Sequence, residues 1–452
     1  MSRLVCRVAV FAIPILIAQN VGAGERAGPA LTGRWGFDLA GADFRNNPGD
    51  DFFRHANGAW YDRALIPADR SSIGVDTVLN ITAEARIREI LERGEEGVGP
   101  SARMDAAKIG AFYAAFMNEV HVEALDAEPI APLLQMIRVA ASREELAELM
   151  GDGRRSFFNS IFALGIGPDD KAPDRYAVSI GQGGLGLNRD YYVTPPEKWR
   201  EYSALEVRPD DLFGDVQGVR KFDWLRQLNR LNSPVDRDDW YMSPQTVNAS
   251  YNASLNEMVF PAGILQPPFF DPAADPAVNY GGIGVVIGHE MIHGYDDEGR
   301  KYDGAGVLST WWTHADADQF AARAAILGRQ FDSYEPFPGL HIKGDLTMGE
   351  NIADLGGALV ALDAYHDSLR DKPAPVIDGL DGDQRFFLSY AQSWRHKSTD
   401  DSIRQQIVSN AHAPVKYRVN GVVRNMDAWY QSFNVKPSDS LFLLPQNRVR
   451  IW

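Results

Sequence analysis

The stretch that decides the fold is Ile287-Gly288-His289-Glu290-Met291-Ile292-His293-Gly294, which contains the pattern H-E-x-x-H. On a helix, His289 and His293 are one turn apart and project from the same face. Two imidazoles placed in this way can bind one Zn²⁺, and Glu290 beside them can take a proton from a water on the metal. With nine histidines in the chain, a chance occurrence is expected on the order of once in a hundred such sequences. The pattern therefore predicts a helical zinc site.

The predicted zinc site needs a third protein ligand, which leaves an open position for water. Metzincins use a third histidine in H-E-x-x-H-x-x-G-x-x-H. Here Asp296 and Gly299 stand where that glycine and that histidine should be, so this class is excluded. A glutamate on a second helix is the alternative. Glu350, in the segment 349–357 (GENIADLGG), is the expected third ligand.

Two carboxylates are expected to orient the ligand histidines. Asp354 follows Glu350 by one helical turn on the same face, where it can accept the outer N–H of a histidine and fix its tautomer. Asp296, three residues after His293, is a second candidate. Alone, each of these carboxylates would more often be solvated, and only the neighbouring H-E-x-x-H favours a role at the metal. The glycines at 356–357 are expected to let this helix pack closely against the motif helix.

The composition is that of an ordinary globular protein with an acidic balance. Hydrophobic residues make up 45% of the 452 residues and charged residues 23%. The length suffices for two or three domains, or for one large two-lobed enzyme. The net charge of −16 argues against a nucleic-acid partner, because such a partner favours a basic face.

The N-terminus predicts a signal peptide over residues 1–23. Arg3 and Arg7 supply positive charge, 8–18 is an apolar run, and 21–23 (VGA) is a small-residue cleavage site. An uncleaved membrane anchor is the alternative.

The only cysteine, Cys6, lies in this segment, so the mature chain has no disulfide and no thiolate ligand. A cysteine-free exported enzyme of this size indicates a bacterial periplasmic or secreted protein.

Hydrophobic periodicity predicts mostly helices. Ser101 is the expected N-cap of the predicted helix 102–119. The predicted helices are 83–93, 102–119, 129–139, 143–150, 222–232, 280–294 (with Gly294 as C-cap), 315–329, 346–370, 384–397, 402–410 and 425–433. Four strands are predicted at 157–164, 176–180, 246–251 and 257–265, with a glycine-rich connection at 181–186 and a loose arm at 24–48.

Several stretches occur in an order that is typical of one family. They are 51–60, 247–251, 259–270, 279–300, 349–357, His412-Ala413-Pro414 with Arg418, and 448–452. On these residues the chain resembles the neprilysin and endothelin-converting-enzyme family of zinc metallopeptidases, in a bacterial form. The resemblance implies an α+β fold that is mainly α with a small β-sheet. It also implies a thermolysin-like zincin catalytic domain over 201–452, with a linker over 24–48 and a truncated helical lobe within 49–200.

The resemblance also implies roles for individual residues. One zinc ion per chain is bound by His289, His293 and Glu350. Glu290 is the general base, and Asp354 and Asp296 orient the two histidines. The implied substrate-side residues are Asn248 and Ala249 on an edge strand, His412 and Arg418 at the oxyanion and substrate carbonyl, and Phe269, Val285, Val286 and Trp394 around the residue after the scissile bond. Without the resemblance, the last four would pass as core residues, and Asn248 as a turn residue or as the start of a glycosylation sequon at 248–250.

Two departures from the family pattern concern the predicted function. Val449 replaces the family's terminal cysteine, and the helical residues that the family carries between the regions of Tyr192 and Trp199 are missing. The favoured prediction is an exported zinc metalloendopeptidase that cleaves oligopeptides on the amino side of hydrophobic residues, with no nucleic-acid partner. The alternative is a zinc-binding but inactive or unstable product. Contact with a membrane is expected only if the N-terminal segment stays uncleaved.

Overall fold

The computed structural model describes residues 5–8, 30–93, 100–152, 162–182, 207–208, 210–370 and 372–451. The chain forms two compact units: Met1–Ile81 with Pro244–Trp452, and Thr82–Ser243. The units change after Ile81 and after Ser243, whereas the predicted domain boundary lies between residues 200 and 201. The predicted cleavage site at 21–23 and the region of the missing residues, 192–199, lie outside the described residues. Among the described residues, no helix is long and apolar enough to cross a membrane.

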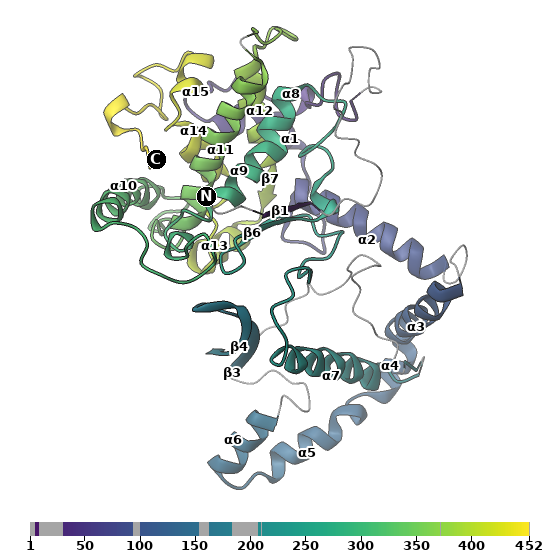
Figure 1. Cartoon of the computed structure of the whole chain (residues 1–452). Coiled ribbons are helices and arrows are strands. Elements are labelled where there is room, and N and C mark those ends of the chain that lie inside the picture. Colours follow the sequence, from purple (N-terminus) through teal and green to yellow (C-terminus); the bar gives the residue numbers. More distant parts are fainter. Residues whose placement is uncertain are drawn as a thin grey trace. The chain divides into compact units, whose positions relative to one another are not determined.

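The core of the first unit is a set of helices around the motif helix (Figure 1). Their bounds are α1 (Phe52–Arg63), α8 (Pro276–Asn279), a π-helical turn (Tyr280–Gly284), α9 (Val285–Ile292), α10 (His314–Asp332), α11 (Met348–Ser368), α12 (Gly382–Ser393), α13 (Asp400–Ser409), α14 (Val415–Val423) and α15 (Asp427–Ser432). The predicted helix 402–410 is confirmed by α13 and 425–433 by α15, with ends that differ by a few residues.

Glycines allow the motif helix to contact α11 closely: Gly357, as predicted, and Gly288, which was not predicted. A Cβ on Gly357 would lie 2.5 Å from the backbone nitrogen of His289, and one on Gly288 would lie 2.6 Å from the carbonyl oxygen of Gly357. On the other side of Gly357, the Cβ of Gly356 would meet the side chain of Ile292. Any larger residue would push the helices apart, so these positions set the distance between α9 and α11.

The N-terminal segment belongs to the same core as the C-terminal half. Asp51 caps α1 through the Arg54 N–H, and α1 packs against α12 and α14 (Figure 1). The side chain of Asn420 on α14 accepts the Phe53 N–H at 2.8 Å and donates to Asp51 at 3.0 Å. Gln392 on α12 donates to the carbonyl of Ala56 at 3.0 Å. These buried hydrogen bonds join residues more than 330 positions apart.

Two small sheets belong to the first unit. One has the strand order β1 (Val5–Val8), β6 (Glu257–Phe260), β5 (Ser250–Asn252), with β1 parallel and β5 antiparallel to β6. The other pairs β2 (Ser72–Gly74) with β7 (His396–Ser398) in antiparallel register. The predicted hairpin at 246–265 is confirmed, but its strands are shorter. Asn248 and Ala249 precede β5, so the prediction that they lie in the strand was wrong.

The predicted helix 280–294 is confirmed over residues 280–292, and the helical run already begins at Pro276. Residues 280–284 of this run are π-helical, where Gly281 and Gly282 approach the carbonyls of Phe386 and Phe269. The run ends at Ile292 with His293 as C-cap, so Gly294 is not the cap. The predicted helix 384–397 ends at Ser393, because residues 396–398 pair with β2 instead.

The second unit contains helices and one β-hairpin. Its elements are the larger part of α2 (Val75–Arg93), α3 (Pro100–Met117), α4 (Glu119–Leu125), α5 (Ala131–Val139), α6 (Arg143–Asp152), β3 (Phe162–Asp169), β4 (Ala172–Gln182) and α7 (Leu212–Arg230). The prediction that Ser101 is the N-cap of α3 was wrong, because the helix already begins at Pro100. The two strands predicted at 157–164 and 176–180 correspond to β3 and β4, of which β4 extends beyond its prediction at both ends. Residues 181–182, predicted as part of a glycine-rich connection, belong to β4, and 183–186 lie outside the described residues.

The second unit has a thin core. Neither α4 nor α5 contains a buried residue, and Phe116, Val120 and Val139 are each more than 60% exposed.

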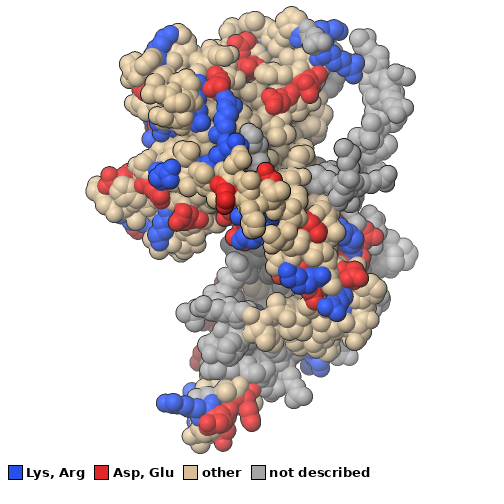
Figure 2. Space-filling model, turned by 60° about the vertical axis from the view of Figure 1, so that its left-hand side comes forward, with Lys and Arg blue, Asp and Glu red and all other residues tan. Residues whose placement is uncertain are grey.

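On the face drawn in Figure 2, Lys and Arg side chains are interspersed with Asp and Glu side chains, and the described residues show no broad basic patch there. The absence of a nucleic-acid partner stays a prediction.

Candidate metal centre

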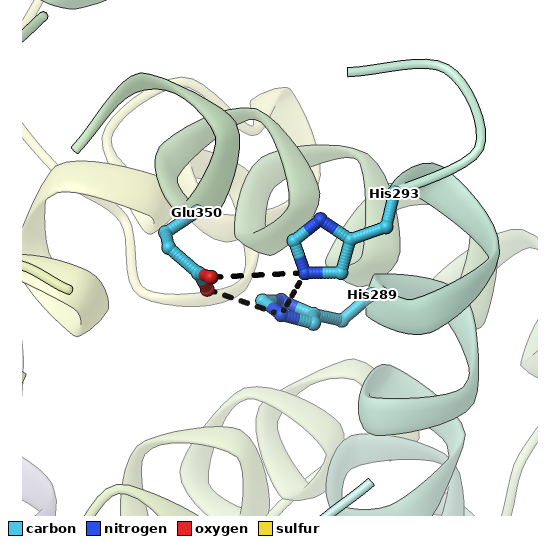
Figure 3. Close-up of side chains that lie close together, drawn as sticks. All are labelled: His289, His293 and Glu350. Carbon is cyan, nitrogen blue, oxygen red and sulfur yellow. Dashed lines mark hydrogen bonds and ion pairs between the residues drawn. The ribbon is translucent and has the colours of Figure 1, made fainter. Parts of the chain in front are cut away.

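His289, His293 and Glu350 point toward one another (Figure 3). The Nε2 atoms of the two histidines are 3.0 Å apart, and Glu350 lies 3.3 Å from His289 Nε2 and 3.8 Å from His293 Nε2. Within the parts of the chain that the structure describes, this is the one group of three or more His, Cys, Asp or Glu with ligand atoms within 4.8 Å of one another. The motif helix supplies the histidines and α11 the glutamate, because the glycine contact brings the two helices together.

The outer nitrogen of each histidine faces a carboxylate. Asp354 Oδ1 lies 2.9 Å from His289 Nδ1, and Asp296 Oδ2 lies 2.6 Å from His293 Nδ1. An ionised carboxylate only accepts, so each Nδ1 carries a hydrogen and each Nε2 presents a lone pair. Burial lowers the pKa of His289, but the hydrogen bonds with Asp354 and Glu350 outweigh it and raise the pKa to about 9. Binding of zinc to Nε2 would therefore release a proton from this ring.

The donor set fits one zinc ion. In a tetrahedral site with Zn–N bonds of about 2.0–2.1 Å, two ligand nitrogens lie about 3.3 Å apart. The observed separations of 3.0, 3.3 and 3.8 Å are close to that value. Two imidazole nitrogens and one carboxylate are ligands that zinc prefers, and three protein ligands leave one position for water. Burial raises the pKa of Glu350, but hydrogen bonds with His289 and His412 and the charge of Arg418 hold it well below its usual range.

Glu290 is buried beside the ligands but is not one of them. Burial raises the pKa of its carboxyl group, and the charges of His289 and His293 offset this only in part. A carboxylate with a raised pKa holds a proton more readily than a solvated one, which suits a group that accepts a proton and gives it back. The geometry is therefore compatible with the base predicted from the motif.

Arg418 connects the ligand glutamate, the orienting aspartate and an aromatic wall. Its guanidinium donates to both oxygens of Asp354 at 2.7 Å and lies 3.5 Å from Glu350. It also lies 3.9 Å from the centre of the Trp394 ring. The buried carboxylates of α11 are thus compensated by one cation. Sequence reasoning placed Arg418 on the substrate side only and missed this second set of partners.

The ligands open into a cavity of about 1090 Å³ that lies within the first unit. All predicted substrate-side residues line it: Asn248, Ala249, Phe269, Val285, Val286, Trp394, His412 and Arg418. His412 Nε2 lies 3.1 Å from Glu350. The amide oxygen of Asn410 accepts the His412 backbone N–H and lies 2.9 Å from its Nδ1. This support for His412 was not predicted, although the two residues are only two positions apart.

Comparisons with known proteins agree with this geometry. Residues 48–208 and 248–449 each match a profile of Peptidase family M13. The chain belongs to peptidase family M13. This confirms the predicted family and the zinc ion. It also confirms the predicted fold class, mainly helical with small sheets.

Two relatives show how much of an M13 protein the sequence matches. The endothelin-converting enzyme homolog of Locusta migratoria is 38% identical over 267 residues, which are 58% of this chain and 36% of that protein. Neprilysin of Homo sapiens is 36% identical over 258 residues, which are 56% of this chain and 34% of that protein. The matched part therefore spans about a third of the length of these relatives.

Solved structures of other proteins resemble most of this M13 chain. The Mycobacterium tuberculosis zinc metalloprotease Zmp1, crystallised with an inhibitor, matches with a TM-score of 0.87 and 31% identity, over 92% of this chain and 99% of that chain. PepO from Lactobacillus rhamnosis HN001 matches with a TM-score of 0.77 over 90% of this chain and 100% of that chain. At 19% identity, PepO supports the fold alone.

Proposed function

We propose that this M13 chain is a zinc metalloendopeptidase that hydrolyses peptide bonds of oligopeptides. The observation that carries the proposal is the convergence of His289, His293 and Glu350 next to the buried carboxyl of Glu290, at the wall of a large cavity. Zinc bound there would polarise the substrate carbonyl and acidify the attacking water. The protein's own residues then have to move one proton and hold a developing negative charge.

Glu290 is proposed to move the proton. It takes the proton of the water whose oxygen bonds to the carbonyl carbon, and it gives that proton to the nitrogen when the C–N bond breaks. His412 is proposed to donate a hydrogen bond to the oxyanion, since its Nε2 already lies 3.1 Å from Glu350 at the same site. Asp354 and Asp296 hold the histidines in the tautomer that presents Nε2.

The cavity walls support a preference on the carboxyl side of the scissile bond. Phe269, Val285, Val286 and Trp394 form an apolar part of the wall. A hydrophobic residue directly after the scissile bond is proposed to bind there. Asn248 and Ala249 precede β5, which lies at the edge of the described three-stranded sheet. A substrate backbone can add to such an edge by main-chain hydrogen bonds.

Chelation tests the proposed activity. The purified chain is expected to contain about one zinc per molecule and to cleave peptides before hydrophobic residues. We expect a strong chelator to abolish cleavage and added zinc to restore it. Zinc binding without any cleavage would instead support the alternative of an inactive product, for which the thin core of the second unit is the structural argument. A chain that cleaves equally well without metal contradicts the proposal.

Export is proposed on the N-terminal segment alone. Two arginines, an apolar run and a small-residue site are typical of a cleaved signal peptide. The exported chain is expected to start at Gly24, and N-terminal sequencing measures this directly. A chain that keeps Met1 or Ser2 at its start would favour the membrane-anchored alternative.

A further inference from the structure

A second polar array lines the same cavity away from the metal ligands. It consists of Asp76, His396 and Ser398. His396 Nδ1 lies 3.2 Å from Asp76 Oδ1, and His396 Nε2 lies 3.0 Å from Ser398 Oγ. His396 and Ser398 are two positions apart on β7, so their side chains project from the same face of the strand. The array therefore runs from the first turn of α2 to the end of β7.

The backbone at Gly74 lies directly against the side chains of His396 and Asp76. Gly74 pairs with His396 across the β2–β7 ladder. A Cβ on Gly74 would lie 2.4 Å from His396 Nδ1 and 2.7 Å from Asp76 Oδ1. Only glycine at this position allows the imidazole and the carboxylate to meet. The contact joins residues 320 positions apart.

Asp76 is held in its ionised form. Burial raises the pKa of its carboxyl group, but the hydrogen bond with His396 and the charge of that ring outweigh it, so the pKa lies below its usual value. Asp76 also lies in the first turn of α2, where the helix dipole favours a negative charge. An ionised carboxylate has no hydrogen to donate, so it accepts from His396 Nδ1.

The tautomer of His396 decides what the array offers to a ligand. When Nδ1 of a neutral imidazole carries the hydrogen, Nε2 can only accept. With the ring in this neutral form, Ser398 uses its single hydrogen to donate to Nε2, and only the lone pairs of its oxygen remain for the cavity. The array presents a hydrogen-bond acceptor, next to the negative charge of Asp76. A ligand group that can donate is satisfied there, and a carboxylate is not.

Chain order and the shared cavity relate the array to the proposed substrate wall. Glu350 contacts Arg418, and Arg418 stacks on Trp394. Trp394 is part of the wall proposed for the residue after the scissile bond, and His396 and Ser398 follow it on β7. The array is therefore assigned to the next substrate residue on the carboxyl side, the second after the scissile bond.

We propose that Asp76, a neutral His396 and Ser398 form a specificity site that selects peptides with a hydrogen-bond donor, such as Gln, over Glu at the second position after the scissile bond. This inference rests on the proposed peptidase function. It names the substrate class of that site more closely: peptides with a hydrophobic residue followed by a residue whose side chain donates hydrogen bonds.

Two peptides that differ only by Gln or Glu at that position test the inference, because these side chains have nearly the same shape. At about pH 9, above the usual range of histidine, the wild type is expected to favour the Gln peptide about tenfold in kcat/KM. Ser398→Ala keeps every charge of the cavity, so it isolates the hydrogen bond from general repulsion of Glu. We expect it to bring the ratio close to one.

Two further variants complete the test. Ser402→Ala, on α13 and outside the cavity lining, is the matched control and should keep the wild-type ratio. Asp76→Asn removes the forced tautomer of His396 and should also lower the ratio. A wild-type ratio near one, or a Ser398→Ala variant with the wild-type ratio, overturns the inference.

Failure of the proposed function is distinguished by a binding measurement. If the wild type hydrolyses neither peptide, the peptidase proposal fails. Fluorescently labelled versions of the two peptides are then titrated with the zinc-loaded Glu290→Gln chain. About tenfold tighter binding of the Gln peptide, lost in Ser398→Ala, supports the specificity site. Equal binding of the two peptides contradicts it.

Discussion

Replacing Glu290 with Gln is expected to lower kcat at least about a thousandfold while zinc stays bound. Gln has nearly the same size as Glu, so the buried position stays filled. Its amide cannot take the proton of the attacking water or return it to the leaving nitrogen. Glu290 is 5% exposed and is not a member of the ligand group, so we expect zinc content near that of the wild type. Steady-state peptide cleavage and metal analysis of the same sample measure both quantities.

Glu335→Gln is the matched control for this experiment. Glu335 is exposed, accepts the Gly339 N–H and lies outside the cavity lining. It should leave kcat within about twofold of the wild type, as for a surface change of small energy. If Glu290→Gln cleaves peptides within tenfold of the wild-type rate, another group must accept the proton. If it loses its zinc, Glu290 acts on the metal site and not in proton transfer alone.

Replacing Arg418 with Met is expected to destabilise the first unit by about 3–5 kcal/mol. The Arg418 side chain is 6% exposed and that of its partner Asp354 is 1% exposed. Burial opposes the charge of Asp354, and the charge and hydrogen bonds of Arg418 outweigh this and lower the pKa of Asp354. Met fills much of the space beside Trp394 but leaves a buried carboxylate without its cation. Urea denaturation, followed by tryptophan fluorescence, measures the loss.

Two variants separate charge from geometry in this prediction. Arg418→Lys keeps the charge but cannot bind Asp354 in the bidentate manner, so we expect an intermediate loss. Arg450→Met removes an exposed partner of Asp427 and should cost less than about 1 kcal/mol. If Arg418→Met and Arg450→Met unfold at the same urea concentration, Arg418 does not stabilise the buried carboxylates.

Helix positions in the C-terminal half could be predicted because helical periodicity is a local property. The predicted helix 315–329 corresponds to His314–Asp332, and 346–370 corresponds to Met348–Ser368. Predictions failed where a distant segment competes for the backbone. Residues 396–398 continue the helical pattern of α12 but pair with Ser72–Gly74. Helix α14, which carries Arg418, was missed altogether.

The sequence by itself was enough to predict the candidate metal ligands and the candidate base. Their relation is a spacing of four residues on one helix plus a Glu-x-x-x-Asp turn, and helical geometry converts such spacings into one face. The close approach of α9 and α11 could also be predicted, since it depends on residues without a side chain.

Only the tertiary structure decided which distant side chains complete the site. Arg418 lies 64 positions from Asp354 in the sequence. Its guanidinium contacts both Asp354 and Glu350, because α14 packs against α11. The N-terminal segment enters the C-terminal core through Asn420 and Gln392. The array of Asp76, His396 and Ser398 exists only because β2 and β7 pair. The H-E-x-x-H stretch could be recognised without a structure, because its residues are close together in the sequence. The walls of its cavity come from segments that are far apart in the sequence, and no local pattern predicts which of these segments pack together.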